Sequence, residues 1–125
     1  MMAKRTYYRA LFFIDAIKAW LLAIQALLMD NSALLNATGQ MFYTSFMVCV
    51  MIVGLGYFIV GLNLDQNHGL VITSIVAQLS VFALFTYYYT IGVAIQLQLI
   101  AGIMDLVFAC LMMEFLINYK KLPPK

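Results

Sequence analysis

The stretch Phe13-Ile-Asp15-Ala-Ile-Lys18-Ala-Trp20 places a carboxylate and an ammonium three residues apart, early in the first of four long apolar runs. Near the centre of a membrane-spanning helix, Asp15 and Lys18 each cost roughly 2.5–3.5 kcal/mol, whereas each Leu, Ile or Phe contributes roughly −0.3 to −0.6 kcal/mol. About ten such apolar residues lie between 8 and 29, so the two sums nearly cancel. The first helix is marginal alone, and we expect its polar pair to depend on neighbouring helices.

The composition indicates an integral membrane protein. Of the 125 residues, 66% are hydrophobic and 10% are charged, and the mean hydropathy is +0.98, whereas a soluble domain carries about 25% charged residues. The net charge of +2 comes from basic residues close to the two ends. Nucleic acid binding needs a basic stripe along one face, so it is not expected. Membrane lipids are the expected surroundings.

The four apolar runs predict an all-α, single-domain fold over residues 1–125, an antiparallel bundle of membrane-spanning helices. The expected spans are about 8–29, 41–62, 70–90 and 94–117. The clearest turn between them is the segment 63–69, in which we expect Gly69 to have a positive φ. A cleavable signal peptide is not expected, because Asp15 and Lys18 interrupt the first run, which is also too long for an h-region.

Small residues and basic residues predict how these helices pack and how they are oriented. Glycines permit close approach of helices in lipid, and we expect this role for Gly54, Gly56, Gly61 and Gly102. Neither the 30–40 loop nor the 90–93 loop has a Lys or Arg. By the positive-inside rule, both termini should face the cytoplasm. The basic residues that flank the termini are Lys4, Arg5, Arg9, Lys120, Lys121 and Lys125.

The strongest polar residues are expected at one depth in the membrane. Counted from the outer edge of each span at ~1.5 Å per residue, Lys18, Gln78 and Asp105 lie close to the bilayer midplane on three different helices. Asp15 lies one turn nearer the cytoplasm, so Lys18 can bridge two carboxylates. A second polar layer nearer the outer surface is expected from Gln25, Ser45, Thr86 and Gln98.

Two interpretations of Asp15, Lys18, Gln78 and Asp105 stay open. They either form a closed hydrogen-bonded network that fixes helix register, or they line a polar pocket or a proton path. Two carboxylates facing one ammonium leave a negative charge, so one carboxylate must be protonated or must meet a cation from outside. A polar stripe of this kind should point into the bundle rather than towards lipid.

The sequence gives no pattern typical of catalysis. It holds no Ser-His-Asp arrangement, phosphate loop or HExxH motif, so no catalytic residue is expected. His68 is the only histidine, which leaves no Cys/His cluster for a metal, and no cofactor is expected. Cys49 and Cys110 should lie at different depths, so a disulfide between them is not expected.

Two stretches resemble a family of known proteins. Gly61-Leu-Asn-Leu-Asp65-Gln-Asn67-His-Gly69-Leu-Val71 resembles the cytoplasmic turn of small bacterial four-helix membrane proteins, and Ala101-Gly102-Ile-Met-Asp105-Leu-Val-Phe-Ala109-Cys-Leu resembles their last helix. These are the DoxX-like families, some of which are similar in layout to EXPERA-type sterol-binding and isomerase proteins. The resemblance covers about the last half of the chain. It implies an antiparallel four-helix bundle with a polar interior in the bacterial plasma membrane. A lysine of the family's third helix is replaced by Gln78 here.

Three functional hypotheses follow. The first is a non-catalytic subunit or accessory protein of a larger membrane assembly, because the chain is small, has short loops and has no soluble domain. Its partners would be other membrane subunits or further copies of the chain. The second is a binding protein or isomerase for a lipid or hydrophobic small molecule, with Asp105 and Lys18 in an apolar pocket. The third is a proton-coupled transporter that works as an oligomer.

Overall fold

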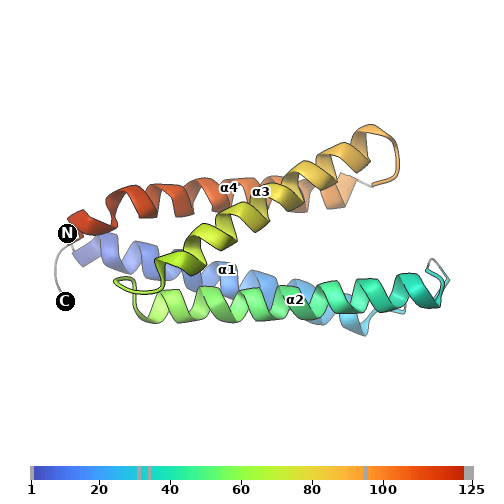
Figure 1. The fold of residues 1–125 in the computed structure, drawn as a ribbon, viewed down its shortest axis with the longest axis horizontal. Coiled ribbons are helices and arrows are strands. Elements are labelled where there is room, and N and C mark those ends of the chain that lie inside the picture. Colours follow the sequence, from blue (N-terminus) through green and yellow to red (C-terminus); the bar gives the residue numbers. More distant parts are fainter. Residues whose placement is uncertain (1, 31, 34, 95, 123–125) are drawn as a thin grey trace.

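The computed structural model describes residues 2–30, 32–33, 35–94 and 96–122, so Lys125 lies outside it. Its helices are α1 (Met2–Leu28), α2 (Ala37–Leu62), α3 (His68–Thr90) and α4 (Gln96–Asn118), followed by the 3-10 helix η1 (Tyr119–Lys121) (Figure 1). The four long helices are each long and apolar enough to cross a membrane. The predicted all-α fold with four spans is confirmed, and the chain is a multi-pass membrane protein by the length and composition of its helices.

Local hydrogen bonds explain where α2 and α3 begin. The Asn36 side chain accepts a hydrogen bond from the Gly39 backbone N–H at 2.7 Å, which caps α2 before the predicted span. The predicted positive φ at Gly69 is wrong, because Gly69 already belongs to α3. Asn67 has the left-handed conformation instead, with φ of 63°. Asn tolerates this conformation because its short side chain can bond locally.

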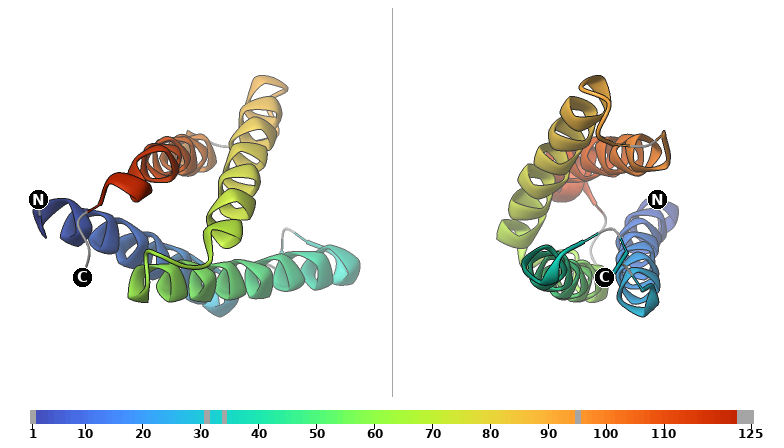
Figure 2. Two further views of the ribbon diagram at one scale, coloured as in Figure 1. Left: turned by 60° about the vertical axis from the view of Figure 1, so that its left-hand side comes forward. Right: turned by 90° about the vertical axis from the view of Figure 1, so that its right-hand side faces the viewer.

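The helices form two antiparallel hairpins, α1–α2 and α3–α4. Packing within each hairpin is much more extensive than packing between the two. Figures 1 and 2 show the hairpins meeting where α1 begins, α4 ends and residues 63–67 connect α2 to α3. We call this the closed end. Towards the opposite end, where the 29–36 and 91–95 connections lie, the hairpins diverge; we call this the open end.

The hydrophobic core lies at the closed end. Phe12 of α1 and Phe115 of α4 are both fully buried, and their rings meet edge-to-face with centroids 5.1 Å apart. An ion pair of 2.7 Å between Arg5 Nη2 and Asp65 Oδ1 ties α1 to the connection between the hairpins. Other buried members of this core are Tyr8, Leu11, Val60, Leu64, Val71, Ile75 and Met112.

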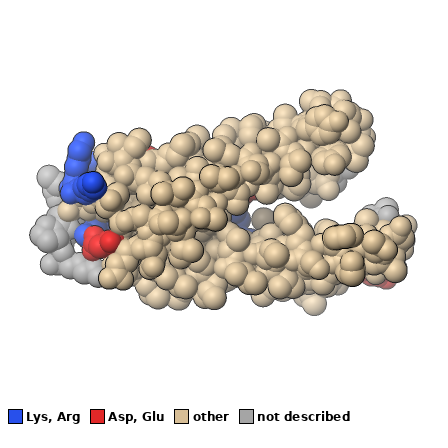
Figure 3. All heavy atoms as spheres, viewed as in Figure 1, with Lys and Arg blue, Asp and Glu red and all other residues tan. Residues whose placement is uncertain are grey.

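Among the residues that the structure describes, the open end has no comparable core. The buried residues of α1 and α4 in this half are small, such as Ala23 and Gly102, and Gly102 lies against Phe85 of its own hairpin. Figure 3 shows a deep gap between the two hairpins on this side. Exposure of apolar side chains here has little cost in a membrane, because lipid tails are as apolar as leucine. The four helices are therefore bundled over only part of their length.

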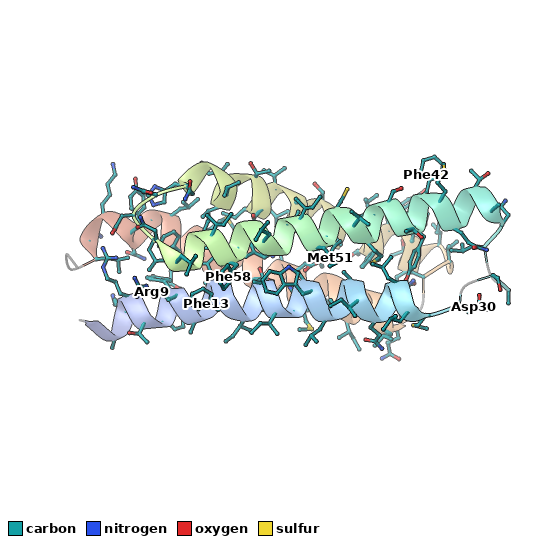
Figure 4. All side chains as sticks on the ribbon, turned by 90° about the horizontal axis from the view of Figure 1, so that it is seen from below. Arg9, Phe13, Asp30, Phe42, Met51 and Phe58 are labelled. Carbon is teal, nitrogen blue, oxygen red and sulfur yellow. The ribbon has the colours of Figure 1, made fainter. Side chains whose placement is uncertain are left out.

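Three of the four glycines expected in helix packing lie at close contacts. A Cβ at Gly54 would meet Trp20, one at Gly61 would meet Phe13, and one at Gly102 would meet Phe85. Phe13 and Phe58, labelled in Figure 4, lie between α1 and α2 with ring centroids 5.4 Å apart. Gly56 takes no part in this packing, since a Cβ there would meet nothing within 4 Å. At about 100° per residue it lies on the face of α2 opposite Gly54.

Gly54→Ala and Gly56→Ala form a matched pair that tests the α1–α2 contact. The added Cβ at Gly54 would lie 2.7 Å from Trp20 Nε1, and moving the indole would break its hydrogen bond of 3.0 Å to the Met51 carbonyl oxygen. We expect Gly54→Ala to lower the free energy of unfolding by about 1–3 kcal/mol. Gly56→Ala should leave it unchanged or raise it by up to ~1 kcal/mol through helix propensity. SDS titration followed by circular dichroism measures both, and equal losses would contradict the packing.

Candidate functional site

The Lys18 ammonium is the centre of the polar site. It lies 2.8 Å from Asp15 Oδ1, a contact that is an ion pair rather than a well-directed hydrogen bond. It also donates a hydrogen bond of 3.1 Å to Asp105 Oδ1. The ammonium lies 4.2 Å from the centroid of the Phe108 ring, at cation–π distance. Lys18 therefore links the first hairpin to α4 of the second.

Asp15 and Gln78 make the second link between the hairpins. Asp15 is fully buried, and its Oδ2 accepts a hydrogen bond of 2.6 Å from Gln78 Nε2 of α3. Gln78 Nε2 also donates to the Tyr57 hydroxyl of α2 at 3.0 Å. The structure thus brings together the four residues singled out from the sequence, Asp15, Lys18, Gln78 and Asp105. With Tyr57 they join all four helices, and we call these five residues the polar network.

Tyr57 is the functional residue that sequence reasoning missed. It is buried and lies one helical turn from Gly54, whose depth matches that of Lys18. A signal was present, because Tyr57 lies more than one helical turn inside the end of its apolar run at residue 62, whereas the other tyrosines lie nearer the membrane interfaces. A buried tyrosine hydroxyl usually needs a hydrogen-bond partner, so a tyrosine at this depth indicates a polar neighbour.

The polar network lies where the two hairpins begin to diverge. Asp15 on its closed side is 0% exposed, whereas the side chains of Lys18 and Asp105 are 14% and 22% exposed. Figure 3 shows a gap between the hairpins that widens towards the open end. We call this gap the cleft. Asp105 is the more accessible of the two carboxylates of the network.

The network contains more hydrogen-bond acceptors than donors. Both N–H groups of the Gln78 amide are used, by Asp15 and Tyr57. Lys18 Nζ contacts Asp15, Asp105 and the Phe108 ring. Gln78 Oε1 is buried and has no hydrogen-bond partner among the described residues. A buried acceptor without a donor is costly, so a further donor would stabilise this site.

The residues expected to form an outer polar layer lie on separate hairpins, which diverge at this level. Gln25 is exposed on α1, and the Ser45 hydroxyl of α2 donates to the Met41 carbonyl oxygen of its own helix at 2.8 Å. On the other hairpin, Thr86 Oγ1 is buried without a hydrogen-bond partner among the described residues. Gln98 borders a hollow of about 260 Å³ near the open end of α3 and α4. These four residues do not form one closed layer.

Metal and disulfide chemistry find little support in the part of the chain that the structure describes. No group of three or more His, Cys, Asp or Glu side chains could hold a metal ion there. Cys49 and Cys110 are both free and exposed.

No family model, curated protein or solved structure matches the chain. The resemblance to the DoxX-like families stays a prediction, and the site is interpreted from its own geometry.

Because of the charge balance in the polar network, substitutions of its different members should lower the free energy of unfolding by different amounts. Lys18→Met leaves two carboxylates without a counter-ion, so we expect the free energy of unfolding to fall by about 3–5 kcal/mol. Asp15→Asn leaves one ammonium with one carboxylate and keeps an acceptor for Gln78, so its cost should be much smaller. Unfolding in SDS, followed by circular dichroism, compares the two. Lys4→Met, at an exposed lysine, is the control. Equal losses for Lys18→Met and Asp15→Asn would contradict the charge argument.

Proposed function

We propose that the protein binds an amphiphilic small molecule or lipid in the cleft between its two hairpins. The observation that carries this proposal is the partial exposure of the Lys18–Asp105 ion pair, which joins the two hairpins that border the cleft. Ligand sites of membrane and soluble proteins alike combine apolar walls with a few converging polar groups. A ligand's polar group would meet this ion pair, and its apolar part would extend towards the open end.

The walls of the cleft follow from helix periodicity. Leu22 lies two turns beyond Asp15 and one turn beyond Lys18, so it continues the face of α1 that points at the second hairpin. Leu22 is 48% exposed, although the polar residues on this face nearer the closed end are mostly buried. On α4, Gln98 lies two turns from Asp105 on the same face. Beyond the ion pair, these two faces thus present the apolar side chain of Leu22 on α1 and the amide of Gln98 on α4.

A purely structural role accounts less well for this exposure. A network that only fixed helix register would gain from complete burial between helices, because charged groups near the membrane centre avoid contact with lipid. Asp15 meets that expectation with 0% exposure, and Asp105 at 22% does not. The exposed carboxylate supports a site that a ligand completes.

Retention of a ligand through mild detergent extraction tests the proposal. Leu22→Trp should fill the cleft and reduce the bound ligand severalfold in native mass spectra. Ile24→Trp is the matched control, since Ile24 is 45% exposed on the opposite face of α1. Equal ligand retention by both variants, or no bound molecule in the unaltered protein, would contradict the proposal. A bound polypeptide in place of a small molecule would support an accessory subunit whose cleft holds a partner's helix.

We also propose that the closed end faces the cytoplasm of a bacterial cell. The support is the group of basic residues at this end, which includes Lys4, Arg5, Lys120 and Lys121. Figure 3 shows basic side chains gathered there, whereas the open end shows none on this face.

Cysteine accessibility in intact cells tests this orientation. In a chain with Cys49→Ala and Cys110→Ala, the variant Ser32→Cys should react with a membrane-impermeant maleimide added outside. Lys121→Cys should react only after the cells are permeabilised, because it lies at the closed end. The reverse pattern would overturn the proposed orientation.

A further inference from the structure

We infer that the ligand of the cleft is a lipophilic amine, whose protonated nitrogen binds the Asp105 carboxylate while its apolar tail lies between the hairpins. This inference rests on the proposed function, since it assigns the chemical class of the molecule in the same cleft. Charge, hydrogen-bond donors and accessibility each support it, one by one.

The charge of the network selects a cation. Asp15 and Asp105 carry two negative charges when ionised, and Lys18 supplies one positive charge to both. An unpaired charge in an apolar environment is costly, so the remaining negative charge needs a partner. An ammonium group brought by a ligand supplies that partner. Protonation of one carboxylate is the other way to remove the charge. The head group that binds distinguishes the two cases, because only an ionised site favours an ammonium group.

The hydrogen bonds of the network select a group with N–H donors. Gln78 Nε2 already donates to Asp15 and Tyr57, and Lys18 Nζ already contacts Asp15, Asp105 and the Phe108 ring. Gln78 Oε1 stays without a donor among the described residues, although Gln78 is only 5% exposed. This buried acceptor is independent of the carboxylates and indicates the same deficit. A primary ammonium brings N–H donors as well as charge, and its bond to a carboxylate is charge-assisted.

Accessibility identifies Asp105 as the residue that binds the ammonium. Asp15 is enclosed by Lys18 and Gln78 and is 0% exposed, whereas Asp105 is 22% exposed. A ligand with a carboxylate or phosphate head group would compete with Asp15 and Asp105 for Lys18. It would also add negative charge to a site that already has an excess. Anionic amphiphiles are therefore disfavoured.

Three photoreactive probes test this inference. They share a dodecyl tail that carries a diazirine and differ only in the head group, which is a primary ammonium, a hydroxyl or a carboxylate. Each is titrated at pH 7 against the full chain in nanodiscs of zwitterionic lipid, and labelled peptides are mapped by mass spectrometry. The ammonium probe should label peptides that contain Leu22 or Gln98 at a concentration about tenfold lower than the hydroxyl probe. The reason is that its charge-assisted hydrogen bond to the carboxylate is stronger than a neutral one. The carboxylate probe should be the weakest.

Variants then locate the head group. Asp105→Asn should remove the preference for the ammonium probe and leave labelling by the hydroxyl probe unchanged. Asp105→Glu should retain the preference, because it keeps the charge. Asp30→Asn is the control, since Asp30 is an exposed carboxylate beyond the end of α1. If Asp105→Asn fails to fold, the comparison of the three probes on the unaltered chain still decides the question.

Each outcome separates this inference from the proposed function. Equal labelling by the ammonium and hydroxyl probes, tightest labelling by the carboxylate probe, or an unchanged preference in Asp105→Asn would overturn the amine assignment. In all three cases, labelling of the cleft walls would still support an amphiphile-binding cleft. Failure of every probe to label the cleft walls would overturn both.

Discussion

The structure depends on one ammonium held between two carboxylates in the membrane interior. Lys18 lies 2.8 Å from Asp15 of its own helix and 3.1 Å from Asp105 of the other hairpin. Without the first contact, α1 would carry two charges that nearly cancel its tendency to insert. Without the second, the hairpins would be joined by the hydrogen bond between Asp15 and Gln78 and by the core at the closed end. The same ammonium therefore stabilises one helix and fixes the distance between two pairs of helices.

Helix geometry explains how much of this could be predicted from the sequence. The rise per residue fixes depth, so counting residues places Lys18, Gln78 and Asp105 at one level before any coordinates are known. The period of the helix also places Gly54 and Gly61, seven residues apart, on one face, and it excludes Gly56 from that face. Depth and face are local properties of a helix. The positions of the four spans and the members of the polar network, apart from Tyr57, follow from them.

The tilt of one hairpin relative to the other depends on contacts between distant segments of the chain. For this feature the sequence-based prediction was incomplete. Gln25, Ser45, Thr86 and Gln98 share a depth, but they lie on hairpins that diverge at that level. The hairpins meet through side chains at the closed end, where Phe12 and Phe115 are fully buried against each other, whereas Gly102 in the outer half packs against Phe85 of its own hairpin. Tyr57 was missed because it stands in an apolar run. A tyrosine there indicates a polar neighbour only when its depth in the membrane is taken into account.

The pairing of Asp15 with Lys18 within a single helix has a consequence for biosynthesis. The hairpin α1–α2 is synthesised first, and its two interior charges neutralise each other before the rest of the chain exists. It can enter the bilayer as a unit whose net interior charge is zero. In the hairpin α3–α4, Asp105 has no basic residue of its own hairpin beside it, and its insertion cost is roughly 2.5–3.5 kcal/mol. Contact with the first hairpin gives this carboxylate its counter-ion, Lys18.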